Sequence, residues 1–152
     1  MNDQLIIATV DVLSLPLVNR FYKHCRYSAK AGRGETVFVA KLGSRIVGAV
    51  RLTPTDNDYL FLRSMCIDPE LRRQGIGQQL LRGMLPFLDQ VNCYCYPFSH
   101  LIDFYNQAGF VHVHEAGAPP WMRTGCERYR QQGRDIQIML RYKPTESIAE
   151  QP

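Results

Sequence analysis

The segment Met65–Leu81 reads MCIDPELRRQGIGQQLL and joins an apolar run to a helical pattern through two glycines. Gly75 and Gly77 have no Cβ, so the chain can turn tightly there and a ligand can approach the backbone amides. The first N–H groups of the following helix have no intrahelical acceptor, and the helix dipole adds positive charge at that end. The segment therefore predicts an anion-binding turn, with phosphate or pyrophosphate as the natural ligand.

Two familiar glycine-rich phosphate motifs do not fit this turn. A dinucleotide site requires G-x-G-x-x-G, and a Walker loop requires G-x-x-x-x-G-K-[ST]. Here Gly75-Ile76-Gly77 is followed by Gln78, with no third glycine or Lys-Ser/Thr pair in register. The anion is therefore expected to be held by another kind of glycine turn.

The pattern Arg72-x-x-Gly75-x-Gly77 resembles the R/Q-x-x-G-x-G/A signature of the GNAT superfamily, the acyl-CoA-dependent N-acyltransferases. Downstream, the run LIDFYNQAGF at residues 101–110 is similar to the second signature of that family, a helix ending in F-Y-x-x-x-G-F. Gly109 is suited to end that helix. The spacing between the two signatures is also typical of the family, and the chain resembles a small single-domain member.

Hydrophobic periodicity and turn residues predict an α+β chain. Strands are expected at residues 4–10, 36–42, 45–52, 59–67, 91–96, 111–114 and 135–142. Helices are expected at 14–27, from 76 to about 88 with a kink or an early end at Pro86, at 99–107, and from about 120 to 130. The resemblance implies the GNAT fold: a mixed, mostly antiparallel twisted sheet of about seven strands, flanking helices and a splayed parallel pair that holds the acyl-CoA. One N-acetyltransferase domain is expected at residues 1–143, with a polar tail at 144–152.

The resemblance also implies the residues of a cofactor site. Amides of the strand before the turn would orient the thioester, at Met65, Cys66 and Ile67. The turn itself would hold the CoA pyrophosphate, through Arg72, Arg73, Gln74, Gly75, Ile76, Gly77 and Gln78. Tyr105 would protonate the departing thiolate, since a phenol stays neutral at working pH and can donate a hydrogen bond. Asn106 would touch the phosphate arm, with helix capping as the alternative.

The acceptor site is less determined by the sequence. Arg63 lies in an apolar strand, where an arginine needs an anionic partner, either an internal acid or a substrate carboxylate. Tyr96 and His100 flank the expected cleft and are candidate substrate contacts, with packing as the alternative for Tyr96. The fourth strand lacks the carboxylate that many family members use as the base, so the candidate bases are Glu35, His100 and Glu115.

Composition limits the remaining classes. Eighteen Lys+Arg against fourteen Asp+Glu give a net charge of +4, too small an excess to indicate nucleic acid as a partner. No segment has the length of a membrane span. Five cysteines without a regular framework favour reduced thiols and a cytoplasmic location. A monomer or homodimer is expected.

The function predicted from these residues and the resemblance is transfer of an acetyl group from acetyl-CoA, as co-substrate and without a metal, to a primary amine on a small molecule. An amino-acid-like metabolite is the favoured acceptor. The alternative is a non-catalytic acyl-CoA-sensing regulatory domain.

Overall fold

The computed structural model describes residues 4–144, and the chain divides into two compact units, Met1–Leu85 and Pro86–Pro152. The first unit has an antiparallel sheet whose strands follow the order of the chain. These strands are β1 (Leu5–Thr9), β2 (Thr36–Leu42), β3 (Arg45–Pro54) and β4 (Tyr59–Ile67). Its helices are η1 (Val12–Ser14), α1 (Leu15–His24), η2 (Pro69–Leu71) and α2 (Ile76–Gly83).

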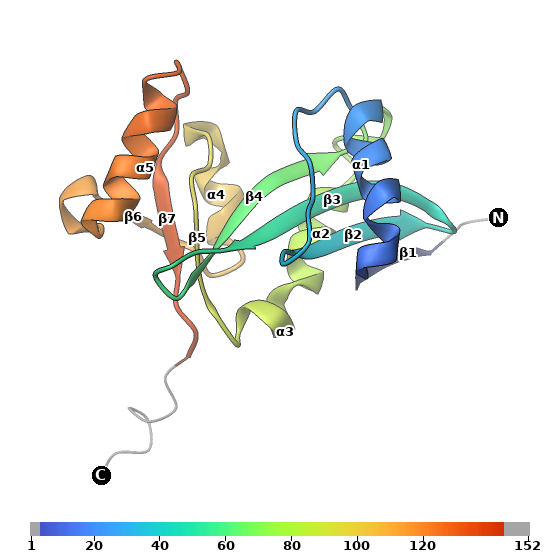
Figure 1. Cartoon of the computed structure of the whole chain (residues 1–152), viewed down its shortest axis with the longest axis horizontal. Coiled ribbons are helices and arrows are strands. Elements are labelled where there is room, and N and C mark those ends of the chain that lie inside the picture. The colour runs from blue at the N-terminus through green and yellow to red at the C-terminus, as the bar shows by residue number, and fades with distance from the viewer. Residues whose placement is uncertain (1–3, 145–152) are drawn as a thin grey trace, which may run out of the picture. The chain divides into compact units, whose positions relative to one another are not determined.

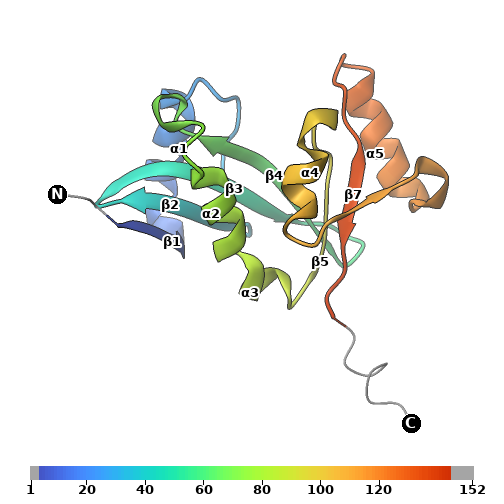
Figure 2. The ribbon, with the colours of Figure 1, turned by 180° about the vertical axis from the view of Figure 1, so that it is seen from behind.

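The sheet of the first unit carries one helix on each face. Figures 1 and 2 show α1 on one side of the strands and α2 on the other. On the α1 side, Val18, Phe21 and Tyr22 pack into one buried cluster with strand residues, namely Val37, Val39, Ala49 and Cys66. On the α2 side, Leu80 and Leu81 are buried, and Gly83 lies so close to Ile7 that a Cβ there would be 2.6 Å from its Cγ2. Burial on both faces makes this sheet the core of the unit.

The pairing of β3 with β4 is interrupted at one point. Ala49 is opposite Cys66 and Arg51 is opposite Arg63, so two β4 residues, Ser64 and Met65, face the single β3 residue between them. This is a β-bulge, and Ser64 adopts a φ of 60° within it. The bulge includes Met65, the first residue of the segment predicted to orient the thioester.

The second unit has three strands in the order β5 (Asn92–Cys95), β7 (Ile138–Arg141), β6 (Val111–Val113), with antiparallel pairs. Its helical segments are α3 (Leu85–Leu88, which begins one residue before the unit), η3 (Ser99–Leu101), α4 (Ile102–Asn106), η4 (Glu115–Gly117) and α5 (Pro120–Arg130). Helix α4 packs near β6 and α5 near β7, on opposite faces of these strands in Figures 1 and 2. Phe110, Met122, Ile138 and Met139 form much of its buried interior.

The predicted α+β class is confirmed, since residues 4–144 contain seven strands with flanking helices. Several boundaries differ from the sequence prediction. The helix expected at 99–107 begins as the 3-10 turn η3, and the strand expected at 135–142 is paired regularly only at Ile138–Arg141, with an isolated bridge between Ile136 and Phe98. The helix expected at 14–27 covers Leu15–His24, and Ser14 makes no side-chain capping bond. Pro86 interrupts the next helix as predicted, since α2 ends at Gly83 and a short α3 follows.

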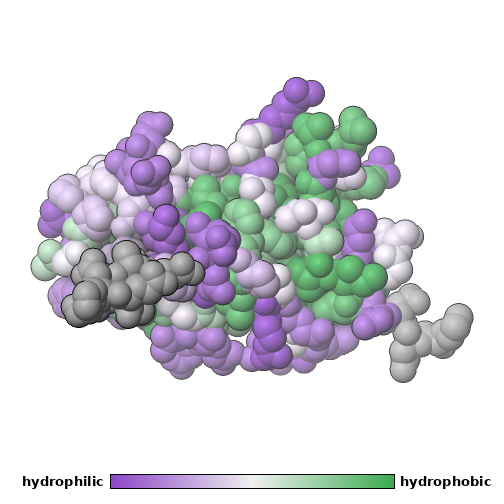
Figure 3. All heavy atoms as spheres, turned by 90° about the horizontal axis from the view of Figure 1, so that it is seen from below, coloured by the Kyte–Doolittle hydropathy of each residue, from purple (hydrophilic) through white to green (hydrophobic). Residues whose placement is uncertain are grey.

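The face drawn in Figure 3 carries both hydrophilic and hydrophobic residues. The large exposed apolar side chains of the first unit include Ile6, Val12, Leu13 and Leu17. Within residues 4–144, none of the helices combines the length and the apolar character that a membrane crossing requires. The expected tail lies, apart from Pro144, beyond the residues that the structure describes, and the single-domain boundary at 143 stays a prediction.

Candidate functional site

The glycine turn begins at a carboxylate that is buried where β4 ends. Asp68 is 1% exposed and accepts hydrogen bonds from Arg45 Nη2 at 2.6 Å and from the Glu70 N–H at 3.0 Å. His24 Nε2 lies 3.5 Å from the same carboxylate. Burial raises the pKa of Asp68, but these donors outweigh it and hold the pKa below its usual value. Asp68 thus anchors the start of η2 and of the turn that follows.

The turn itself consists of exposed backbone in an unusual conformation. Arg73 has a φ of 66° and Gly75 a φ of 79°. Residues 72–75 are exposed, and a Cβ built at Gly75 would meet no atom within 4 Å. Ile76 is buried and fixes the first turn of α2. Glycine is required at Gly75 by its conformation, because an L side chain rarely adopts this φ.

The amides of this turn are available to a ligand. Within the described part of the chain, the N–H groups of residues 72–77 have no protein acceptor, and the Gln79 N–H is the one that bonds to the Gly75 carbonyl, at 3.0 Å. Successive unpaired amides before a helix make a concave anion site. Arg72 and Arg73 add positive charge beside it, and Arg72 Nε donates to the Ile67 carbonyl at 3.3 Å. The geometry therefore fits a phosphate or pyrophosphate group.

The end of β4, at Met65 to Ile67, lies directly before the glycine turn and packs partly into the core. Cys66 is buried in the α1-side cluster, and Met65 and Ile67 are half-buried. Burial raises the pKa of the Cys66 thiol, which argues against a nucleophilic thiolate. The Asp68 N–H donates to the Val47 carbonyl at 2.8 Å and continues the pairing with β3. Met65, Cys66 and Ile67 therefore stay candidates through their backbone amides rather than through their side chains.

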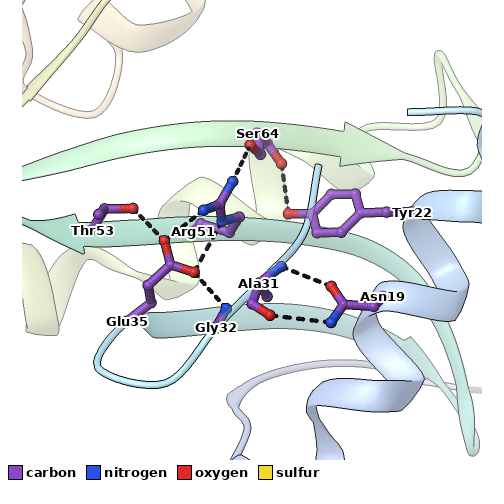
Figure 4. Close-up of polar contacts among 8 residues, drawn as sticks. All are labelled: Asn19, Tyr22, Ala31, Gly32, Glu35, Arg51, Thr53 and Ser64. Carbon is purple, nitrogen blue, oxygen red and sulfur yellow. Dashed lines mark hydrogen bonds and ion pairs between the residues drawn. The ribbon is translucent and has the colours of Figure 1, made fainter. Parts of the chain in front are cut away.

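A polar network lies on the α1 side of the same sheet (Figure 4). Arg51 makes two hydrogen bonds with Glu35, Nε to Oε1 at 3.0 Å and Nη2 to Oε2 at 2.7 Å. Glu35 also accepts from the Gly32 N–H at 2.9 Å and from the Thr53 hydroxyl at 2.5 Å. Burial raises the pKa of Glu35, and the donors lower it further than burial raises it. A carboxylate engaged in this way is a poor proton acceptor, so its geometry favours a positioning role over that of the base.

Arg63 lies directly opposite Arg51 in the β3–β4 pairing, so the two side chains share a face of the sheet. Its guanidinium carbon lies 5.1 Å from the centroid of the Phe61 ring, in a cation–π contact. Among residues 4–144, no carboxylate forms an ion pair with Arg63. Glu35, the buried acid of this network, is paired with Arg51. Arg63 is therefore a half-buried cation that is open to an anionic ligand.

In the second unit, Tyr105 lies on α4 and is 5% exposed. Its ring makes edge contacts with Phe104 and Phe110, at centroid distances of 5.0 and 5.8 Å. Gly109 has a φ of 89° and ends the helical segment as predicted. Asn106 is exposed at the end of α4, and its carbonyl accepts from the Gly109 N–H at 3.1 Å. The F-Y-x-x-x-G-F segment thus packs the Tyr105 ring against the rings of Phe104 and Phe110.

The other candidates of the second unit have protein partners. The Tyr96 hydroxyl donates to the Met122 carbonyl at 2.7 Å, and burial raises the pKa of Tyr96 above its usual range. His100 is exposed and stacks on Phe98 at 6.0 Å. Glu115 forms an ion pair with Arg130. The Tyr96 hydroxyl is therefore engaged by the protein, whereas the His100 and Glu115 side chains are both exposed.

Sequence reasoning missed the Arg51–Glu35 pair and the conformation of Ser64. A signal for the first was present, because Arg51 stands between Val50 and Leu52 in an apolar strand, as Arg63 does among its own apolar neighbours. No signal marks Ser64, since the left-handed region is usually occupied by glycine, asparagine or aspartate. Each of the five cysteines is a free thiol, in agreement with the expectation from composition.

Comparison with solved structures identifies relatives in fold. The ribosomal-protein-S18-alanine N-acetyltransferase from Escherichia coli has a TM-score of 0.67 and 16% identity, with 93% of this chain and 96% of that chain covered. The protein Rv2747 from Mycobacterium tuberculosis, solved in complex with CoA, has a TM-score of 0.65 and 14% identity, with 90% and 98% covered. N-acetylglutamate synthase from Neisseria gonorrhoeae, complexed with coenzyme A and N-acetyl-glutamate, has a TM-score of 0.66 and 14% identity.

That match covers 95% of this chain but 36% of the synthase, so the chain spans about a third of that protein. No curated protein matches the sequence significantly. The family model described as an acetyltransferase (GNAT) domain matches residues 33–112, which include the glycine turn, the bulged strand and Tyr105. Because this match covers more than half of the sequence, the chain belongs to the GNAT acetyltransferase family.

Proposed function

We propose that this protein transfers an acetyl group from acetyl-CoA to the primary amine of a small acceptor that carries a carboxylate. The observation that carries the proposal is the run of amides at residues 72–77, which have no protein acceptor in the described part of the chain. Such a turn suits the pyrophosphate of CoA, and relatives in fold have been solved with CoA.

Acetyl-CoA supplies the activated acyl group as a thioester. In the proposed reaction the amine nitrogen forms a bond to the acyl carbon and gives up one proton to a base or to solvent, the carbon–sulfur bond breaks, and the thiolate takes a proton. We assign the amides of Met65, Cys66 and Ile67 to the thioester oxygen, since hydrogen-bond donors that are fixed beforehand stabilise charge that develops there. Tyr105 is assigned as the proton donor to sulfur, a role for which a neutral phenol is suited.

Arg63 supports the choice of acceptor. Arg63 is half-buried, has no ion-pair partner among residues 4–144, and lies on the face of β4 that also carries Phe61. Planar guanidinium binds carboxylate through two parallel hydrogen bonds. An amino acid or a similar metabolite would provide both the amine and the carboxylate. One relative in fold, the synthase from Neisseria gonorrhoeae, was solved in complex with N-acetyl-glutamate, an N-acetylated acidic amino acid.

A non-catalytic acyl-CoA sensor is the second candidate. It is favoured by the engagement of Glu35 with Arg51 and by the sequence of β4, which carries no carboxylate that could serve as the base. Turnover separates the two functions, because a sensor would bind CoA without releasing free thiol from acetyl-CoA in the presence of any amine.

The proposal is tested by measuring thiol release from acetyl-CoA with pairs of acceptors, each an L-amino acid and its carboxamide. We expect the amino acid to be preferred, and Arg63→Leu to raise its KM about tenfold to a hundredfold, the equivalent of about 1.5 to 3 kcal/mol. Acetyl-CoA affinity should not change. If the best acceptor has no acidic group, or if Arg63→Leu leaves the preference intact, Arg63 does not bind the acceptor.

A further inference from the structure

We propose that Tyr22, Arg51 and Glu35 are positioning residues that hold the β4 bulge at Ser64 and thereby aim the amides of Met65 to Ile67. The inference rests on the proposed function, which assigns those amides to the thioester. Nothing in the glycine turn takes part in it. The three residues come from helix α1, strand β3 and the loop before β2, and they converge on β4 (Figure 4).

The backbone conformation of the bulge is intrinsically unfavourable at Ser64. Ser64 has a φ of 60°, in the left-handed region that disfavours a residue with a Cβ. The other non-glycine residues with positive φ in the described part of the chain, namely Arg26, Asp58 and Arg73, lie outside the strands. A strained conformation inside a strand persists only where surrounding contacts determine it.

Two contacts made directly with Ser64 provide this restraint. The Tyr22 hydroxyl donates to the Ser64 carbonyl at 2.8 Å, and Arg51 Nη1 donates to the Ser64 hydroxyl at 3.2 Å. The Tyr22 ring is fully buried against α1-side residues, so its hydroxyl is fixed in direction. Burial also raises the pKa of Tyr22 far above its usual range, which keeps the hydroxyl a donor.

Arg51 is held in turn from its other side. Its two hydrogen bonds to Glu35 use both carboxylate oxygens, and the side chains are 11% and 8% exposed. Glu35 is fixed by the Gly32 N–H and the Thr53 hydroxyl. The preceding loop is joined to α1 because Asn19 both donates to and accepts from the backbone of Ala31, at 3.1 and 2.7 Å. The network that runs from Asn19 through Glu35 and Arg51 to Ser64 therefore contains a specific hydrogen bond at each of these contacts.

Loss of an anchor should therefore change the direction of the backbone after Ser64 while leaving the cofactor turn in place. A displacement of about 1 Å at a reacting group can lower a rate about a hundredfold. The signature of positioning is a fall in kcat with unchanged acetyl-CoA affinity. A purely structural role would lower the amount of folded protein and leave the kcat of the folded fraction unchanged.

The test compares Tyr22→Phe with Thr55→Val in the full chain. Tyr22→Phe removes one hydroxyl that donates to a backbone carbonyl of β4. Thr55→Val removes another such hydroxyl, which donates to the Tyr59 carbonyl at 2.7 Å, at the end of β4 away from the bulge. We expect Tyr22→Phe to lower kcat tenfold to a hundredfold and to move the ¹³Cα chemical shift of Ser64 away from its wild-type value. Thr55→Val should do neither, and acetyl-CoA affinity should stay within twofold in both.

A folded Tyr22→Phe protein with wild-type kcat, or with an unchanged Ser64 shift, would overturn the proposal. If Tyr22→Phe does not fold, Ser64→Ala serves as the second variant, because it removes only the hydroxyl that accepts from Arg51. The same measurements of kcat and acetyl-CoA affinity then test the proposal, and we expect kcat to fall at least threefold. The chemical shift needs no turnover. If the wild-type protein acetylates no amine, the proposed function fails, and an unmoved Ser64 shift in Tyr22→Phe then refutes the anchor separately.

Discussion

Replacing Arg51 with methionine should be among the most destabilising single changes in the first unit. The change leaves the Glu35 carboxylate, which is 8% exposed, without its cation. Breaking a buried ion pair from one side costs about 3 to 5 kcal/mol. Two neutral donors, the Gly32 N–H and the Thr53 hydroxyl, remain with Glu35, so the lower end of this range, about 3 kcal/mol, is expected. Glu35→Leu should cost as much, since it leaves Arg51 with only the Ser64 hydroxyl.

The double variant Glu35→Leu/Arg51→Met separates the cost of leaving one buried charge unpaired from the cost of changing the side-chain shapes. With both charges gone, three hydrogen bonds are still lost, namely those that Glu35 accepts from Gly32 and Thr53 and the one that Ser64 accepts from Arg51, at about 1 kcal/mol each. We expect Glu35→Leu/Arg51→Met to lose about 3 kcal/mol, well below the sum of the single changes, with a coupling of at least about 2 kcal/mol. Urea unfolding followed by far-ultraviolet circular dichroism measures these values. Additive single changes, or a loss under about 1 kcal/mol in Arg51→Met, would refute the assignment of a buried ion pair.

Two further outcomes follow from the site. Tyr105→Phe keeps the ring packed between Phe104 and Phe110 and removes the hydroxyl, so kcat should fall about a hundredfold with acetyl-CoA affinity unchanged; wild-type turnover would assign the proton to another group. Acid should destabilise the folded protein partly by protonating the carboxylates of Glu35 and Asp68. Their pKa values are lowered in the folded state, so their stabilisation is present above the unfolded pKa values of about 4 and is lost as the pH falls through the folded ones. The free energy of unfolding should therefore decrease below about pH 4 less steeply in Asp68→Asn than in the wild type, and an unchanged slope would contradict this.

Those parts of the fold that depend on neighbouring residues could be predicted from the sequence. Gly43 marks the β2–β3 turn and has a φ of 61°, and Gly75 marks the start of α2. Both positions need a residue without a Cβ, which the sequence displays directly. The interruption at Pro86 follows for a similar reason, because proline removes a helical N–H. Local backbone chemistry is readable without knowledge of the tertiary structure.

The features that escaped prediction depend on contacts between distant segments. Arg51 and Arg63 have similar apolar surroundings in the sequence, and only the path of the loop before β2 decides that Glu35 reaches Arg51. Ser64 carries no mark of its left-handed conformation, because Tyr22, forty-two residues earlier in the chain, supplies the bond that holds it. The exposure of a side chain such as His100 is likewise set by packing rather than by its own sequence position.

The central claim is that the amides around Gly75 bind CoA, and calorimetric titration of CoA into a matched pair of variants tests it most directly. Gly75 and Gly133 have φ values of 79° and 88°, and a Cβ at either position meets no atom within 4 Å. Valine should therefore strain both turns to a similar degree, whereas only Gly75 lies among the unpaired amides at residues 72–77. We predict that Gly75→Val weakens CoA binding at least tenfold while Gly133→Val binds like the wild type. Wild-type affinity in a folded Gly75→Val protein, or equal losses in both variants, would contradict the claim.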